Sequence, residues 1–201
     1  MFNKQKLFYT PLYADVVKIN PEYKEQLIED LIKYADEDIP IADGDERIMN
    51  DGRKGYYSTA MTFVDCDIPS LKTFVLALQD KVQQEIDNDL FVADFGFNIH
   101  QKGTYQTLVN NPDVEYNGNY ILKCGPDNSG INMSELNGEY RLVNPNTFTK
   151  PIYHPVQARE DMFFVWPGSV MWEMLPNRTD NNRISIQLYI ERLRDRNEQK
   201  R

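Results

Sequence analysis

Hydrophobic positions change their spacing once along this chain. In the first half they recur every three or four residues in two stretches, which predicts amphipathic helices over residues 21–36 and 69–88. Asn20 and Pro21 supply a capping side chain and a first-turn proline for the first helix. From Phe91 onward the apolar spacing becomes two, which is typical of β-strands.

The strands expected from this alternation are short, and turns rich in Gly, Asn and Pro separate them. They lie at residues 56–64, 91–99, 104–109, 119–124, 139–143, 162–166, 169–175 and 183–191. A further segment, 7–19, mixes β-branched and aromatic residues around Pro11, as an edge strand does. Two helices and then seven or eight short strands favour an α+β, mainly β fold, a jelly-roll sandwich with both helices on one sheet.

No internal repeat or linker divides the chain. Residues 1–191 are therefore expected to form one domain, followed by a basic tail at 192–201. Segment 36–54 is acidic, rich in Asp and Gly and without periodicity, which predicts a long loop.

The last expected strand has the clearest alternation of the chain. One row of it is apolar and the other is polar: Ile184, Ile186, Leu188 and Ile190 against Arg183, Ser185, Gln187 and Tyr189. A polar row on an inner strand would line a pocket, whereas the same row on an outer face would simply meet water. The pattern alone leaves both interpretations open.

Composition excludes some classes of function. The formal charge of −9 argues against general binding to phosphate backbones. No apolar stretch approaches the roughly 20 residues of a membrane span, and no apolar stretch of signal-peptide type follows the basic start. The expected location is therefore inside a cell, or inside a particle that the cell assembles. The basic tail is interpreted as a solvated end, with docking on an acidic partner as the alternative.

Neither the cysteines nor any common catalytic motif indicates a reaction. Cys66 and Cys124 are the only cysteines and are expected to be packing residues in a reducing compartment, although a single disulfide between them stays open. The sequence contains no Gly-x-Ser-x-Gly elbow, Walker loop or Cys-x-x-Cys pair. Asp65, Cys66 and Asp67 are expected to form a turn at the end of a strand.

Five segments, taken in order, carry a more specific signal. They are 7–13 (LFYTPLY), 103–105 (GTY), 116–121 (YNGNYI), 164–169 (FVWPGS) and 182–186 (NRISI). Together they resemble a family of 2-oxoglutarate- and Fe(II)-dependent oxygenases that is common in bacteriophages and marine bacteria. The resemblance implies a double-stranded β-helix, the cupin-like form of the jelly roll.

The resemblance also implies where an iron site would lie. Members of the family hold Fe(II) with two His and a carboxylate or third His, and leave positions open for 2-oxoglutarate and dioxygen. The ligands follow the Gly-x-Tyr segment and the Pro-Gly turn, which places them at Val109, Asn111 and Trp172. Valine has no lone pair, indole only donates, and a neutral amide is a poor ligand for a transition metal. The resemblance thus implies a degenerate member of this family, in which the metal triad is missing.

The scarcity of histidine leads to the same expectation without any alignment. His100 and His154 are the only histidines, and Lys102 and Val156 occupy the positions two residues beyond them. Neither therefore begins a His-x-carboxylate pair. In the remaining alternative, both histidines meet a carboxylate such as Glu173 in space. No catalytic residue and no metal ligand is predicted, and Fe(II) and 2-oxoglutarate are expected as cofactors only if the chain is an active enzyme.

The anion-binding end of the family's pocket is retained in the sequence. In the family, an Arg on the closing strand binds the distal carboxylate of 2-oxoglutarate, together with a Ser two residues on and often a Tyr from a central strand. The resemblance assigns Arg183, Ser185 and Tyr120 to such a vestigial pocket. The alternative is that Arg183 bonds an internal carboxylate and ties the barrel together.

These inferences favour a non-catalytic domain that serves as a structural or interaction subunit, with other protein subunits as partners in a homo-oligomer. The phage setting of the family suggests a virion part, in the neck, collar or tail, and so a location in the virion or the host cytoplasm. Two alternatives stay open. One is an active dioxygenase that hydroxylates an unknown substrate, and the other is a phage-encoded protein that binds a small anion around Arg183.

Overall fold

The computed structural model describes residues 3–7, 10–37, 56–109, 111–125, 139–143, 153–157 and 159–193. Most of the expected loop 36–54 and nearly all of the expected tail 192–201 lie outside these residues, so both stay predictions.

Two helices and eleven strands make up the described chain. In order they are β1 (Asn3–Leu7), β2 (Thr10–Val16), α1 (Pro21–Glu37), β3 (Tyr56–Met61), α2 (Pro69–Glu85), β4 (Leu90–His100), β5 (Gln106–Val109), β6 (Tyr116–Lys123), β7 (Glu139–Val143), β8 (Tyr153–Gln157), β9 (Met162–Pro167), β10 (Met171–Met174) and β11 (Arg183–Arg192). The mainly β fold class expected from the sequence is confirmed.

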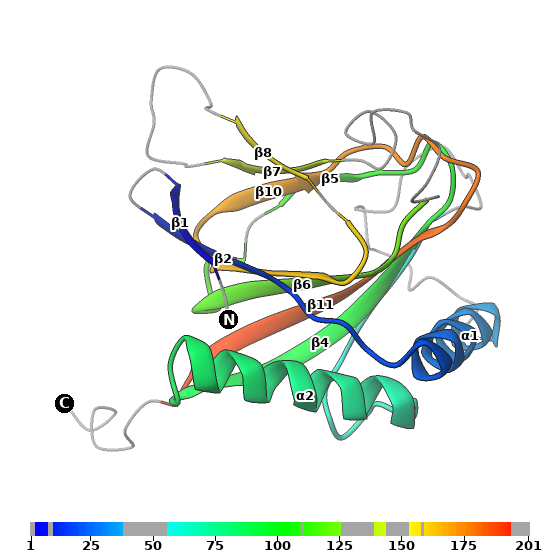
Figure 1. Cartoon of the computed structure of the whole chain (residues 1–201), viewed down its shortest axis with the longest axis horizontal. Coiled ribbons are helices and arrows are strands. Elements are labelled where there is room, and N and C mark those ends of the chain that lie inside the picture. Colours follow the sequence, from blue (N-terminus) through cyan, green and yellow to red (C-terminus); the bar gives the residue numbers. More distant parts are fainter. Residues whose placement is uncertain are drawn as a thin grey trace.

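The strands form two antiparallel sheets that face each other. The larger has the order β1-β2-β9-β6-β11-β4-β3, and the smaller has the order β5-β10-β7-β8. Several neighbouring strands, such as β2 and β9 or β4 and β11, are far apart in sequence, as in a jelly roll. Figure 1 shows the smaller sheet on one side of the larger, and α1 and α2 on the other side.

The helices cover the larger sheet through a continuous apolar core. The expected stripe of α2 is buried there: Leu71, Phe74, Val75, Leu78 and Val82. From the sheet, Ile184, Ile186, Leu188 and Ile190 of β11 join the same core. The apolar row of the last strand therefore packs beneath the helices, and its polar row must face the smaller sheet.

Helix starts follow the local sequence signals. The Asn20 side-chain oxygen accepts the Glu22 backbone N–H at 2.8 Å, so the cap of α1 is present as expected. Pro69 occupies the first turn of α2, where its missing N–H leaves no hydrogen bond unmade.

The structure differs from the expectations at two strands. Segment 7–19 is not one edge strand, because β1 pairs with β2 as a hairpin and β1 takes the edge. Strand β8 was not expected at all, since Pro155 interrupts its short apolar pattern; it lies at the edge of the smaller sheet, where proline is tolerated.

The expectation for the cysteines is confirmed. Cys66 and Cys124 are both free and buried, and burial raises the pKa of the Cys66 thiol. The turn after β3 covers residues 63–65, so of the expected turn residues 65–67 only Asp65 lies in it. Among the described residues, neither helix is long and apolar enough to cross a bilayer.

Candidate functional site

The polar row of β11 is buried between the two sheets. Arg183 is 1% exposed, Ser185 is 0% exposed and Gln187 is 5% exposed. A row facing bulk water would not be buried to this degree, so the solvent-facing interpretation is wrong. The site is therefore the inner layer of the sandwich.

Neighbouring strands extend this polar layer. On β4, His100 lies opposite Arg183 and Asn98 opposite Ser185. On β6, Asn119 lies opposite Gln187, and Gln187 approaches Gln106 of the smaller sheet at 3.5 Å. Because directly opposed residues share a face, these side chains form one buried polar strip.

Arg183 bridges the two sheets at one end of this strip. Its Nη2 donates to the backbone carbonyl oxygen of Leu175, just beyond β10, at 2.9 Å. Burial, and then the charge of Arg183, hold the pKa of His100 well below its usual range. His100 is therefore a neutral imidazole beside a buried guanidinium.

Tyr120 does not join Arg183 and Ser185. Its register partner is Ile186, and both belong to the core beneath the helices. The expectation that it completes an anion pocket therefore fails on geometry, since adjacent strand residues point to opposite faces. The ring of Tyr120 instead packs against Phe74 of α2 at a centroid distance of 4.7 Å.

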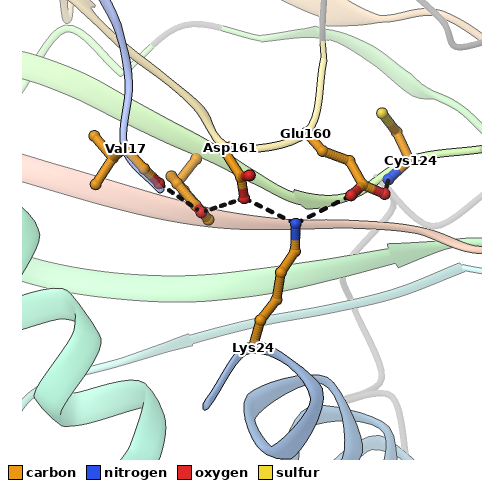
Figure 2. Close-up of polar contacts among 6 residues, drawn as sticks. Val17, Lys24, Cys124, Glu160 and Asp161 are labelled. Atoms are coloured by element: carbon orange, nitrogen blue, oxygen red, sulfur yellow. Dashed lines mark hydrogen bonds and ion pairs between the residues drawn. The ribbon is translucent and has the colours of Figure 1, made fainter. Parts of the chain in front are cut away.

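The Tyr120 hydroxyl belongs to a polar network on the helix side, which Figure 2 shows. It lies 2.9 Å from Asp161 Oδ1 and 3.0 Å from the Val17 carbonyl oxygen. Burial, followed by the adjacent Asp161 carboxylate, raises the pKa of Tyr120 far above its usual range. The hydroxyl therefore stays protonated and acts as a hydrogen-bond donor.

Lys24 of α1 completes this network. Its Nζ lies 2.8 Å from Asp161 Oδ1 and 3.0 Å from Glu160 Oε2, as Figure 2 shows. The other Glu160 oxygen accepts the Cys124 backbone N–H at 3.0 Å. Every member has a partner, so the network fastens α1 to the sheet and offers no free group for chemistry.

The three positions where the resemblance places iron ligands do come together. Val109 pairs with Trp172 across β5 and β10. Asn111 follows β5, and its backbone N–H bonds the Gly168 carbonyl oxygen at 3.2 Å. The structure thus brings these segments to one end of the inner layer.

Trp172 is buried in an apolar cluster at this end. It is 2% exposed and meets Trp166 edge to face, with ring centroids 5.5 Å apart. Other members of the cluster are Leu12, Ile121, Cys124, Phe164, Val170 and Met174. The side chain at the expected position of the distal ligand is therefore an indole that packs against a second indole.

These residues do not fit Fe(II). A valine, an amide and an indole give no strong donor, and no group of three or more His, Cys, Asp or Glu gathers among the residues that the structure describes. Of the alternative trio, His100 lies on β4 of the larger sheet and His154 on β8 of the smaller one. Glu173 alternates with inward-facing Trp172 and Met174, so it points outward.

Sequence reasoning missed the asparagines of this layer. Asn98, Asn117 and Asn119 are at most 3% exposed. The signal was present in the alternation of segment 116–121, where Asn occupies every second position before the apolar residues. A polar row on a central strand is typical of a lined interior, so the pattern of β6 has the same meaning as that of β11.

The chain was compared with protein-family models, curated proteins and solved structures. No protein-family model matches the chain, and the search of curated proteins found no relative. Among solved structures, a prolyl-4-hydroxylase from Pseudomonas putida is similar with a TM-score of 0.65 at 12% identity, over 94% of this chain and 96% of that one. AviO1 from Streptomyces viridochromogenes Tue57 gives 0.64 at 11% identity, over 90% of each chain.

A third similar structure is HygX from Streptomyces hygroscopicus, solved with nickel and 2-oxoglutarate bound. Its TM-score is 0.60 at 10% identity, over 91% of this chain and 83% of that one. Identities this low concern the fold alone. The chain therefore has the double-stranded β-helix fold of the 2-oxoglutarate-dependent oxygenases, with two helices backing its larger sheet.

Proposed function

We propose that this chain is a non-catalytic form of the oxygenase fold that serves as a structural or interaction subunit. The observation that carries the proposal is the residue set at the expected ligand positions, Val109, Asn111 and Trp172. Because these side chains cannot hold a transition metal, the fold is retained without the chemistry that needs one.

The packing around Trp172 supports the same proposal. An enzyme of this class needs a metal ligand at the position that Trp172 occupies. Here Trp172 and Trp166 pack edge to face and are each 2% exposed. A buried aromatic pair contributes stability, which is what a scaffold requires.

Metal binding and turnover test the absence of catalysis. Wild-type protein is incubated anaerobically with Fe(II) and 2-oxoglutarate, then assayed for bound iron and for succinate formed on admitting air. We expect neither to exceed the protein-free control. Stoichiometric iron with succinate production by the wild type would overturn the proposal.

A matched variant makes a negative result informative. The triple substitution Val109→His, Asn111→Asp and Trp172→His restores the ligand types that the family uses at these positions. If the positions are correctly assigned, the triple variant binds Co(II) or Fe(II) and the wild type does not. Failure of the folded triple variant to bind metal would show that the ligand positions are misassigned.

The finer part of the proposal is a bacteriophage virion role, in the neck, collar or tail. Its support is the sequence resemblance to a family common in phages, and it carries with it the expectation of a homo-oligomer. Sedimentation velocity of the purified chain and mass spectrometry of purified particles test it. We expect a discrete oligomer and a fixed copy number per particle, whereas a monomer absent from particles would contradict the assignment.

A second candidate function is metal-free binding of a small dicarboxylate. Arg183 and Ser185 share the inner face, and the Ser185 hydroxyl has no hydrogen-bond partner among the described residues. An Arg–carboxylate contact is charge-assisted and favourable. Titration with succinate and with 2-oxoglutarate, using Arg183→Gln as the control, decides whether this end still binds anions.

A further inference from the structure

Two residues with buried N–H donors lie opposite each other on neighbouring strands at the tryptophan end of the inner layer. Asn117 of β6 and Trp166 of β9 are direct cross-strand partners. They are 3% and 2% exposed. Within the described part of the chain, neither Asn117 Nδ2 nor Trp166 Nε1 has an acceptor. Buried donors are nearly always satisfied, so this pair indicates an acceptor that the described residues do not supply.

The orientation of Asn117 is fixed by a neighbour. Asn111 Nδ2 donates to Asn117 Oδ1 at 2.7 Å. Because the amide oxygen is used in this bond, the amide N–H groups are the atoms that Asn117 presents to the interior. The bond also polarises the amide and strengthens its donors.

The surroundings decide the class of molecule that fits. Trp172, Phe164 and Ile121 provide aromatic and apolar walls in the same cluster as Trp166. No Asp or Glu is buried among the residues that the structure describes. N–H donors repel a cation, and a pair of uncharged donors in an apolar wall gives an anion no counter-charge.

We propose that the interior beside Asn117 and Trp166 binds a small uncharged carbonyl compound, such as an amide or ketone, whose oxygen accepts from both N–H groups. The apolar body of the molecule packs on the tryptophan rings. This site goes beyond the structural role proposed above and uses neither a metal nor Arg183. Its failure would leave the metal and turnover results unchanged.

The tryptophan content of the chain gives a direct measurement. The sequence has two tryptophans, so an ¹H–¹⁵N spectrum contains two indole N–H signals. The variant Trp172→Phe identifies the Trp166 signal and keeps an aromatic ring at position 172. Wild-type protein is titrated with N-methylacetamide, and with sodium acetate as the charged counterpart.

We expect the Trp166 indole proton to shift downfield and saturate with N-methylacetamide, and to respond at least tenfold more weakly to acetate. The folded variant Asn117→Asp replaces two donors by an acceptor and should weaken N-methylacetamide binding at least tenfold. Trp172→Phe, which leaves both donors in place, should bind within about threefold of the wild type.

Three results would overturn the proposal. One is a Trp166 signal that stays fixed or moves linearly with probe in the wild type. Another is tighter binding of acetate than of N-methylacetamide, which would assign the donors to an anion. The last is a persistent Overhauser effect from water to the Trp166 indole proton at saturating probe, which would show that a resident water satisfies the pair.

Discussion

His100 is a single buried imidazole whose charge state is coupled to folding. It lies opposite Arg183 and is 0% exposed. Burial, followed by the positive charge of Arg183, holds its pKa well below the usual range. The unfolded chain has no such constraint, and histidine there titrates near about 6.5.

This difference predicts a loss of stability in mild acid. Below about pH 6.5 the unfolded state takes up a proton that native His100 does not, so the free energy of unfolding falls as the pH decreases toward the lowered native pKa. The loss from this residue is at most about 1.4 kcal/mol per pH unit. Urea unfolding of wild type and His100→Gln at pH 7.5, 6.5 and 5.5 measures it. The variant should lose less stability than the wild type over this range, and parallel losses would contradict the prediction.

The Tyr120 hydroxyl is a second residue whose contribution can be isolated. It bonds Asp161 and the Val17 carbonyl oxygen, while its ring packs on Phe74. Tyr120→Phe keeps the ring and removes the donor, which should lower the free energy of unfolding by about 1–2 kcal/mol. Chemical denaturation measures the change.

The matched control is Tyr105→Phe. The Tyr105 side chain is half-buried, and its hydroxyl makes no hydrogen bond within the described ranges. We expect a change within about 0.5 kcal/mol there. Equal losses in both variants would mean that the Asp161 bond contributes nothing specific.

At the scale of elements, Lys24 adds ion pairs to the apolar contacts that hold helix α1 against the larger sheet. Burial alone would lower the pKa of Lys24, but its hydrogen bonds to Asp161 and Glu160 more than compensate and raise it. Lys24→Met would leave two neighbouring carboxylates without their shared cation. We expect a loss of about 1–2 kcal/mol, measured by denaturant unfolding.

A pair on the surface provides the comparison. Lys102 bonds Asp180 at 2.7 Å, but the two side chains are 61% and 88% exposed. Solvent screens such a pair, so Lys102→Met should change stability little. An equal loss of stability in Lys102→Met and Lys24→Met would contradict the prediction that the Lys24 ion pairs stabilise more because they are less exposed.

Elements with a strong local signal could be predicted from the sequence. Both helices and most strands lie where the apolar period placed them, because a buried face imposes that period directly. Strand β8 was missed because Pro155 hides an edge strand, whose stability comes from pairing with β7.

The candidate site was predictable only in part, for a related reason. The inner row of β11 follows from strict alternation, and Arg183 and Ser185 are buried as that row required. In β6 the alternation places Asn117 and Asn119 on one face and Tyr120 on the other, but the sequence does not show which of these faces meets the inner row of β11. That depends on the register between β6 and β11 and on packing against α2, which are contacts between segments far apart in sequence.

At the scale of the whole molecule, three layers share one central sheet. The helices and the larger sheet enclose a continuous apolar core, whereas the layer between the sheets is part apolar and part polar. Figure 1 shows the smaller sheet on the face away from the helices. Polar packing stabilises less per unit area than apolar packing, so the smaller sheet should be the less stable layer.

Hydrogen exchange followed by mass spectrometry tests this order. In the wild type we expect the slowest exchange in β4, β6 and β11 and faster exchange in β5 and β10. Arg183 bonds the Leu175 carbonyl oxygen just beyond β10, so Arg183→Met should speed exchange in β10 by about tenfold while β4 and α2 change less than threefold. A uniform acceleration across all layers would mean that the molecule opens as one unit. In that case the bond from β11 to the end of β10 would contribute to global stability rather than hold the smaller sheet in place.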